Sequence, residues 1–152
     1  MARHISFENY NAKISGFGLA ILGPSDGDSH VTTQVIGIYG YRFSTVIRTY
    51  GNIATGDYYM KSDVYSFGVV LLELMTGLRA SDPTHPAGQQ NLVDWLKPIL
   101  SQKIKLRSII DKRIEGRYSL NAMLLATQLS LKCLESDPEI HPSMKEVVNA
   151  LE

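Results

Sequence analysis

Apolar residues recur at helical spacing in the second half of the chain, and the densest pattern lies between Ser62 and Gly77. Apolar side chains occupy every face of the helix expected there, and such a helix must be buried on all sides. Ser62 is a candidate N-cap, because its hydroxyl can accept a hydrogen bond from the first turn. Gly77 suits the left-handed residue that ends many helices. The pattern therefore predicts a central, buried helix.

Four shorter segments after this helix also show helical features. A Pro- and Gly-rich loop separates it from the next helix, which Asn91 is expected to cap. A short helix is expected around residues 103–111, and apolar residues return to helical spacing over residues 120–135. The last helix begins at Ser143 with Glu146 three residues later, the pattern of a capping box.

The first part of the chain lacks a helical stripe. Residues 1–11 show no period, and residues 12–15 form a candidate short strand. Residues 21–58 are rich in Gly, Thr, Ser, Asp and Tyr and are interpreted as one long loop. The sequence therefore predicts a mostly α-helical fold with about five helices after that loop, and roughly two strands at most.

The length and composition fit one domain, and the charge balance does not predict a strongly charged binding partner. Of the 152 residues, 44% are hydrophobic, which is enough for a sizeable core. Lys plus Arg and Asp plus Glu number 15 each, so the formal net charge is zero and nucleic-acid binding is not expected. The tightest basic group is interpreted as a solvated helix face, with a docking patch as the alternative. That group consists of Lys103, Lys105, Arg107, Lys112 and Arg113.

Cysteine content and hydropathy limit the classes of protein further. Cys133 is the single cysteine, so an internal disulfide is excluded, and its apolar neighbours predict a buried, unreactive thiol. The longest apolar stretch, residues 64–75, has 12 residues, which is too short to span a bilayer. Residues 1–13 contain no apolar core of the kind found in signal peptides. No transmembrane segment is therefore expected.

Spacing alone assigns no catalytic or metal-binding residue. The four histidines are far apart in sequence, and no Cys or His cluster has the spacing of a metal site. Gly16, Gly18 and Gly23 do not match the phosphate-binding pattern Gly-x-Gly-x-x-Gly, and no helical pattern follows them.

Five segments nevertheless resemble, in the same order, parts of a protein kinase domain. They are AKISGFGLA (12–20), VIGIYGY (35–41), IATGDYYMKSDVYSFGVVLLELMTG (53–77), NLVDW (91–95) and KCLESDPEIHPSM (132–144). The Tyr-Gly-Tyr and Asn-Leu-Val-Asp-Trp forms are similar to those of plant receptor-like cytoplasmic kinases.

The resemblance implies that residues 12–152 are an incomplete protein kinase domain behind an irregular segment at 1–11. The expected fold is a partial, mostly α-helical C-lobe, in which a long activation-type loop precedes about five helices and the N-lobe is absent. Residues 42–52 (RFSTVIRTYGN) have no counterpart in the family pattern. That segment is expected to be exposed and mobile and to be cut first by trypsin, at Arg42 or Arg48.

At the positions that are catalytic in the family, this sequence departs from the family pattern. In the family, the Asp of Asp-Phe-Gly binds the Mg²⁺ that bridges the ATP phosphates. Gly16 stands at that position before Phe17 and Gly18, and glycine offers no carboxylate to a hard cation. The Gly-rich loop, the strand lysine and the His-Arg-Asp loop have no counterpart in these residues. Hence no catalytic, cofactor-binding or metal-binding residue is expected, although the intact family uses ATP and Mg²⁺.

Other family positions have regulatory or structural interpretations. Thr32 and Thr33 match activation-loop phosphosites, with simple solvated threonines as the alternative. Asp63 matches an acidic residue that braces the catalytic loop, with a helix-terminal charge favoured by the dipole as the alternative. His141 stands where the family has an Arg that pairs with the Glu of Ala-Pro-Glu, so both halves of a buried ion pair are expected to be lost.

The resemblance implies descent from kinases that phosphorylate Ser or Thr with ATP in receptor-like kinase signalling. This chain is expected to be truncated and inactive, as a pseudokinase. The alternative is a non-catalytic binding module or decoy that engages kinase partners through exposed helix faces, and an unrelated helical interaction domain has the least support. The family resemblance implies a cytoplasmic location that extends to the periphery of the plasma membrane.

Overall fold

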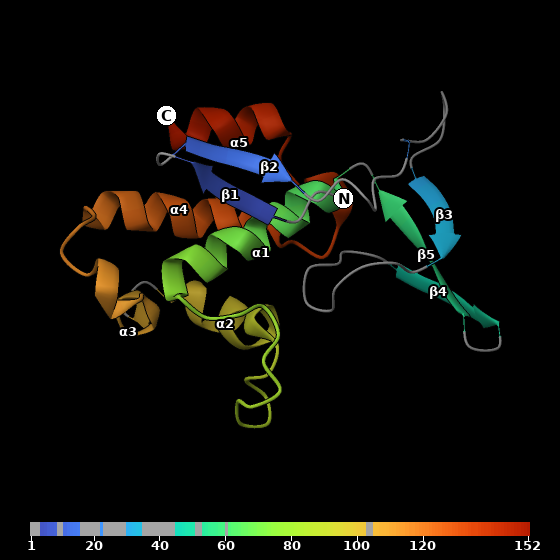
Figure 1. Cartoon of the computed structure of the whole chain (residues 1–152), viewed down its shortest axis with the longest axis horizontal. Helices are drawn as coiled ribbons and strands as arrows, with labels where there is room; N and C mark the ends of the chain where they lie inside the picture. Colours follow the sequence, from blue (N-terminus) through green and yellow to red (C-terminus); the bar gives the residue numbers. More distant parts are fainter. Residues whose placement is uncertain are drawn as a thin grey trace.

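A computed structural model of the chain describes residues 4–8, 11–15, 22, 30–34, 45–50, 53–59, 61–102 and 105–152 (Figure 1). Five α-helices lie in this part of the chain, in agreement with the prediction. They are α1 (Ser62–Thr76), α2 (Leu92–Leu100), α3 (Leu106–Ile109), α4 (Leu120–Cys133) and α5 (Met144–Leu151). Two short 3₁₀ helices, η3 (Lys112–Ile114) and η4 (Pro138–Ile140), lie in the connections before and after α4.

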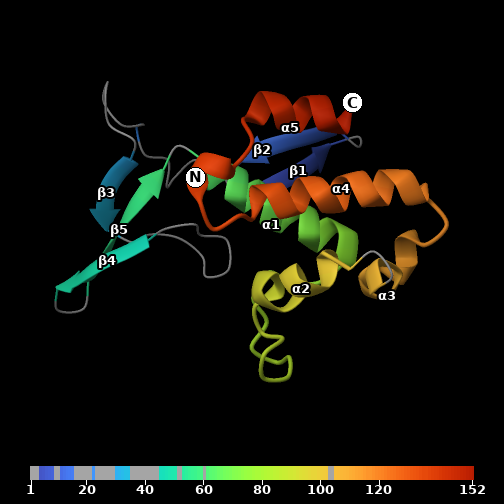
Figure 2. The same cartoon turned by 180° about the vertical axis from the view of Figure 1, so that it is seen from behind.

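The strands precede the helices and form two antiparallel sheets. They are β1 (His4–Glu8), β2 (Asn11–Ser15), β3 (His30–Gln34), β4 (Thr45–Tyr50) and β5 (Ile53–Tyr59). Strand β1 pairs with β2, and the second sheet has the order β3-β5-β4. Figure 2 shows the three-stranded sheet at one end of the molecule, away from α2 and α3. Strand β2 confirms the strand expected at residues 12–15.

Strands β3 and β4, and β5 except for its last residue, lie within residues 21–58, where one long loop and fewer strands are expected from the sequence. The reason is visible in composition, because the β4 and β5 segments are rich in Thr, Val, Ile and Tyr, which favour strands. A Gly-Asn dipeptide, typical of tight hairpins, separates the two segments in sequence. Most of the segment 42–52 is therefore strand β4, in which Arg48 lies opposite Thr55 of β5.

The core of the helical part forms where α1 packs against α4 and α2. Val69 and Leu72 of α1 and Leu96 of α2 are fully buried. The central position of α1 follows from its sequence, because apolar residues surround most of its circumference. At Gly68 the backbone of α1 approaches α4 closely, and the Ser130 hydroxyl donates to the Gly68 carbonyl at 3.2 Å. The approach depends on a residue without a side chain at position 68.

Local capping signals set the helix ends, with one exception. Gly77 ends α1 with a left-handed φ of 70°, and the Asn91 side chain accepts hydrogen bonds from the first turn of α2, as predicted. Ser143 and Glu146 form the predicted capping box of α5. Ser62, the predicted cap of α1, is instead its first helical residue, and the N-cap position belongs to Lys61. The Ser66 hydroxyl donates to the Ser62 carbonyl.

Apolar exposure is unevenly distributed over the helices. Leu74 is the large apolar residue of α1 that is exposed, at 57% of its surface. Further exposed apolar residues lie on α4, on η4 and along α5. They are Leu120, Leu125, Ile140, Met144, Val148 and Leu151. In the part of the chain that the structure describes, every helix is too short or too polar to cross a membrane.

Cys133 lies at the end of α4 with no exposed surface, which confirms the predicted burial. Removal from water disfavours the thiolate and raises the pKa of the Cys133 thiol to about 11. Because the thiolate is the reactive species, this cysteine is unreactive in the folded protein.

Candidate functional site

The structure distributes the sequence-predicted positions over separate regions. Gly16, Phe17 and Gly18 lie outside the described residues. Thr32 and Thr33 lie in β3, where their backbones are opposite Asp57 and Gly56 of β5. The assignment of the two threonines as phosphosites therefore remains a prediction from the sequence.

Asp63 lies in the first turn of α1 with its side chain exposed. The first turn of a helix presents unpaired backbone N–H groups and the positive end of the helix dipole. A carboxylate at this place is favoured by that dipole. The position therefore suits the second interpretation given above, a helix-terminal charge.

His141 is buried, with 2% of its surface exposed, and lies in the connection between η4 and α5. Its two ring nitrogens lie near two backbone carbonyls. Nδ1 is 3.3 Å from the carbonyl oxygen of Lys61, and Nε2 is 2.8 Å from that of Glu135. The imidazole therefore joins the start of α1 to the connection that follows α4.

Lys61 strengthens the same junction from the side of α1. Its Nζ donates to the carbonyl oxygens of His141, at 2.8 Å, and Glu139, at 3.2 Å. The ring of Tyr65, one turn along α1, lies with its centroid 6.2 Å from that of His141. Burial, together with the charge of Asp94, raises the pKa of the Tyr65 hydroxyl. The junction of Lys61, Tyr65 and His141 thus joins two segments that are 80 positions apart in sequence.

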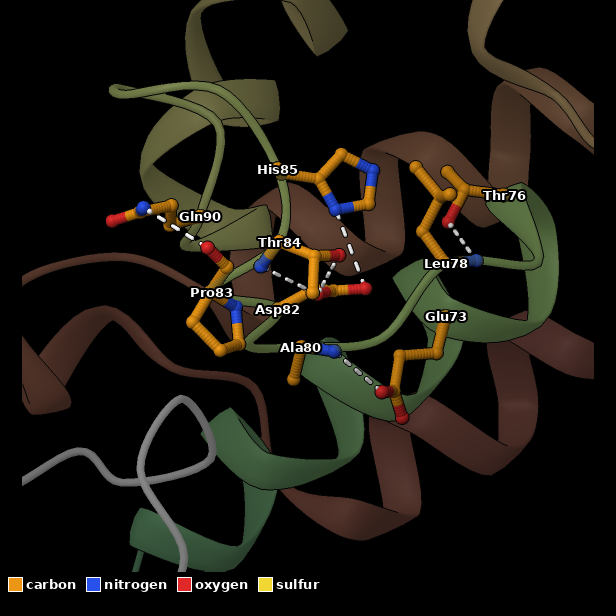
Figure 3. A network of polar contacts seen from close by, with 9 residues as sticks. All are labelled: Glu73, Thr76, Leu78, Ala80, Asp82, Pro83, Thr84, His85 and Gln90. Atoms are coloured by element: carbon orange, nitrogen blue, oxygen red, sulfur yellow. Dashed lines mark hydrogen bonds and ion pairs between the residues drawn. The ribbon is translucent and has the colours of Figure 1, made fainter.

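A second polar cluster organises the loop between α1 and α2, and Figure 3 shows it from close by. Glu73 of α1 accepts a hydrogen bond from the backbone N–H of Ala80 at 2.6 Å. The Thr76 hydroxyl donates to the carbonyl oxygen of Leu72 at 2.8 Å and accepts from the N–H of Leu78 at 3.3 Å. The last turn of α1 therefore holds the first residues of the loop.

Asp82 is the centre of the outer half of this cluster. Its Oδ1 accepts hydrogen bonds from the N–H and the hydroxyl of Thr84, at 2.9 and 2.6 Å. Its Oδ2 lies 3.4 Å from Nδ1 of His85, a contact that is an ion pair only when the imidazole is protonated. The hydrogen bonds from Thr84, with smaller contributions from His85 and Arg79, lower the pKa of the Asp82 carboxyl. Gln90 closes the loop with a hydrogen bond to the Pro83 carbonyl (Figure 3).

The chemistry of this cluster favours a structural role over a catalytic one. A nucleophile needs an adjacent base that can take its proton. Here the Thr84 hydroxyl and the His85 imidazole both contact the same Asp82 carboxylate, whose lowered pKa makes it a weak base. The arrangement is that of an Asx turn, which holds a loop in one conformation. Within the described residues, no group of three or more His, Cys, Asp or Glu side chains is placed to hold a metal ion.

Sequence reasoning did not single out this loop beyond its Pro and Gly content. The sequence Asp82-Pro83-Thr84 was the local indication of this turn. An Asp side chain commonly accepts a hydrogen bond from the backbone N–H two residues later and so forms an Asx turn. The contact between Glu73 and Ala80 carried a weaker signal, since it depends on where α1 ends.

Comparisons with known proteins place the chain in one family. A sequence profile described as "Protein tyrosine and serine/threonine kinase" matches residues 2–151. The "probable serine/threonine-protein kinase CST" of Arabidopsis thaliana is 51% identical over 144 residues, which cover 95% of this chain and 33% of the relative. The "serine/threonine-protein kinase PBL36" of the same plant is 48% identical over 142 residues, covering 93% of this chain and 29% of the relative.

The chain thus spans about a third of the length of the curated relatives that it matches. The resemblance to protein kinases, first seen in five short segments, extends over nearly all of the sequence. The helical part has the number of helices expected for a C-lobe. The chain therefore belongs to the protein tyrosine and serine/threonine kinase family.

Proposed function

We propose that this chain is a non-catalytic member of the serine/threonine branch of the kinase family, and that it contributes a helical C-lobe without transferring phosphate. The observation that carries the proposal is Gly16 at the position of the metal-binding Asp. Family membership and the serine/threonine kinases among the relatives support the branch. Signalling downstream of plant receptors is the setting that this branch suggests.

The physical reason lies in how phosphoryl transfer is catalysed. The reaction depends on positioning and on the stabilisation of phosphate charge, mostly by Mg²⁺ and by lysine. Mg²⁺ requires oxygen ligands in near-octahedral geometry, and Gly16 supplies none from a side chain. The 152 residues also contain no His-Arg-Asp sequence and no Gly-rich phosphate loop. These 152 residues therefore do not contain the groups that would do the chemistry.

The purified chain, incubated with labelled ATP and Mg²⁺, is expected to label neither itself nor a Ser/Thr peptide. Gly16→Asp is expected to stay inactive as well, because the base and the lysine are still missing. A melting curve is expected to be unchanged by millimolar ATP, since a ligand that binds only the folded state would raise the melting temperature.

Two controls make this test decisive. An active relative serves as the positive control, and its Asp→Gly variant at the position that matches Gly16 is expected to lose most of its activity. Time-dependent labelling by the chain that Gly16→Asp increases would contradict the proposal, because it would show that the nucleotide site is assembled.

A second candidate function, a binding module that engages kinase partners, is favoured by one feature of α5. Met144, Val148 and Leu151 follow the helical i, i+4, i+7 spacing and are each about half exposed, at 47%, 49% and 54%. Val147, at the i+3 position along the edge of the same stripe, is buried and anchors α5. An apolar stripe of this kind on a helix is a common docking element for protein partners.

If α5 is such an element, Val148→Asp is expected to weaken the association with a full-length receptor-like cytoplasmic kinase by about tenfold, because a buried valine contributes roughly 1.5 kcal/mol. The neighbouring Asn149→Asp adds the same charge at an exposed position outside the stripe and is the matched control. Size-exclusion chromatography and calorimetry measure the association. Equal weakening by both variants, or no association of the unmodified chain, would rule out this role for α5.

A further inference from the structure

Positive charge is concentrated in one segment of this electrically neutral chain. Residues 105–117, here called the basic segment, contain five Lys or Arg and two Asp or Glu residues. The segment includes α3 and η3 and leads into α4. All five cationic side chains are exposed. They are Lys105, Arg107, Lys112, Arg113 and Arg117.

Within the part of the chain that the structure describes, most of this charge has no ion-pair partner. Arg113 pairs with Asp111, with Nη2 and Oδ2 2.7 Å apart, and its Nε donates to both carboxylate oxygens. The hydrogen bonds from Arg113 lower the pKa of the Asp111 carboxyl. Among residues 61–102 and 105–152, no salt bridge involves any of the other four cations. Their charge remains available to a partner.

A surface hollow of about 270 Å³ lies within this region and adds an apolar component. Its wall is formed by Arg107, Glu115, Gly116, Tyr118 and Leu120. Tyr118 packs partly against the core, whereas Leu120 is 51% exposed. At Gly116, with a φ of 77°, the space next to the backbone is open. The hollow therefore joins an unpaired guanidinium to an exposed leucine and an aromatic ring.

We propose that the hollow and the basic segment dock an acidic peptide segment of a partner protein. An apolar side chain of the peptide enters the hollow against Tyr118 and Leu120. Arg107, in the wall, and the neighbouring cations attract the acidic residues on either side of it, because complementary charge steers and orients association.

The shape and the charge pattern favour a peptide over an anionic membrane. A concave wall admits one side chain, whereas a bilayer presents a continuous plane. Asp111 and Glu115 also lie in the basic segment, and a uniformly negative surface would repel both. A peptide can place its carboxylates beside the cations and away from Asp111 and Glu115, and present only its apolar side chain to the wall that includes Glu115.

The test uses the full chain and a fluorescein-labelled peptide in which glutamates surround one phenylalanine. Fluorescence anisotropy is expected to show binding that weakens as salt is added. Arg107→Gln is expected to weaken it by about three- to fivefold, the upper range for an exposed charge pair. Leu120→Ser is expected to weaken it as well. Lys145→Gln removes another exposed cation, one on α5 and outside the basic segment, and is expected to have no effect.

Three results would overturn the proposal. Equal weakening by Arg107→Gln and Lys145→Gln would show that only the overall charge matters. Equal binding of a peptide with glutamine in place of glutamate would remove the role of the cations. Binding to vesicles that contain phosphatidylserine, without binding to the peptide, would assign the surface to a membrane. The three substituted positions, Arg107, Leu120 and Lys145, are exposed, so each variant is expected to fold, and a melting curve verifies this.

Discussion

Leu72→Ala is expected to lower the free energy of unfolding by about 2–5 kcal/mol, the range for removing a buried leucine side chain. Leu72 is fully buried in the core between α1, α2 and α4. The substitution loses the burial of the removed carbons, and it leaves a cavity that a packed core fills only partly. Urea unfolding, followed by circular dichroism, measures the change as a shift of the midpoint at constant slope.

Leu74→Ala is the matched control, because it makes the same chemical change on the same helix. Leu74 is 57% exposed, so the substitution removes little buried surface, and an effect within about 0.5 kcal/mol is expected for a surface position. If the two variants were equally destabilised, the orientation of α1 in the core would be wrong. The pair therefore tests which face of α1 the rest of the C-lobe covers.

Gly68→Ala is expected to destabilise the protein, although alanine is the better helix former. Alanine in place of glycine gains about 1 kcal/mol of helix propensity. A Cβ atom at position 68, however, would lie 2.7 Å from the Cβ of Cys133 and 3.1 Å from the Cγ of Leu134. Overpacking of this kind costs about 1–3 kcal/mol, so the net loss is expected to reach roughly 2 kcal/mol.

Double variants identify the clash as the cause. Cys133→Gly removes the Cβ atom that position 68 would meet, whereas Cys133→Ala keeps it. The effect of Gly68→Ala is therefore expected to shrink in the Cys133→Gly background and to persist in the Cys133→Ala background, with a coupling energy of about 0.5–3 kcal/mol in the first cycle. A Gly68→Ala protein more stable than the unmodified chain would show that α1 and α4 are farther apart than described.

Both experiments bear on function, because they concern the frame that holds the proposed docking surfaces. Helix α4 carries Leu120 at one end and Cys133 at the other, and α1 is its main neighbour. A change in the distance between α1 and α4 would shift the wall of the hollow. Variants of the hollow and of α5 are therefore best interpreted beside the melting curves of Leu72→Ala and Gly68→Ala.

The helices after residue 61 were predictable because their signals are local. A cap acts within one turn, so Asn91 and the pair Ser143 and Glu146 identified the starts of α2 and α5, and Gly77 identified the end of α1. The family was predictable for a related reason, since its motifs are short contiguous strings in a fixed order. Gly16, the residue on which the proposed inactivity rests, belongs to one of these strings.

The strands were less predictable because pairing is not local. Residues 30–34 are paired with residues 55–59, between 21 and 29 positions away, and nothing in either string specifies that partner. The Gly-Asn signal between β4 and β5 was present in the sequence, but its meaning depends on two flanking strands that are recognised only together.

The sequence by itself determined the helices, the caps at Gly77, Asn91 and Ser143, and the family. Only the tertiary structure decided that Leu72 is buried while Leu74 is exposed, because α1 is apolar around most of its circumference and its pattern does not identify the covered face. Only the tertiary structure brought His141 to Lys61, 80 positions earlier, where a buried imidazole meets backbone carbonyls. Contacts of this kind depend on how the helices pack, and packing follows from the shape of the whole core rather than from any local pattern.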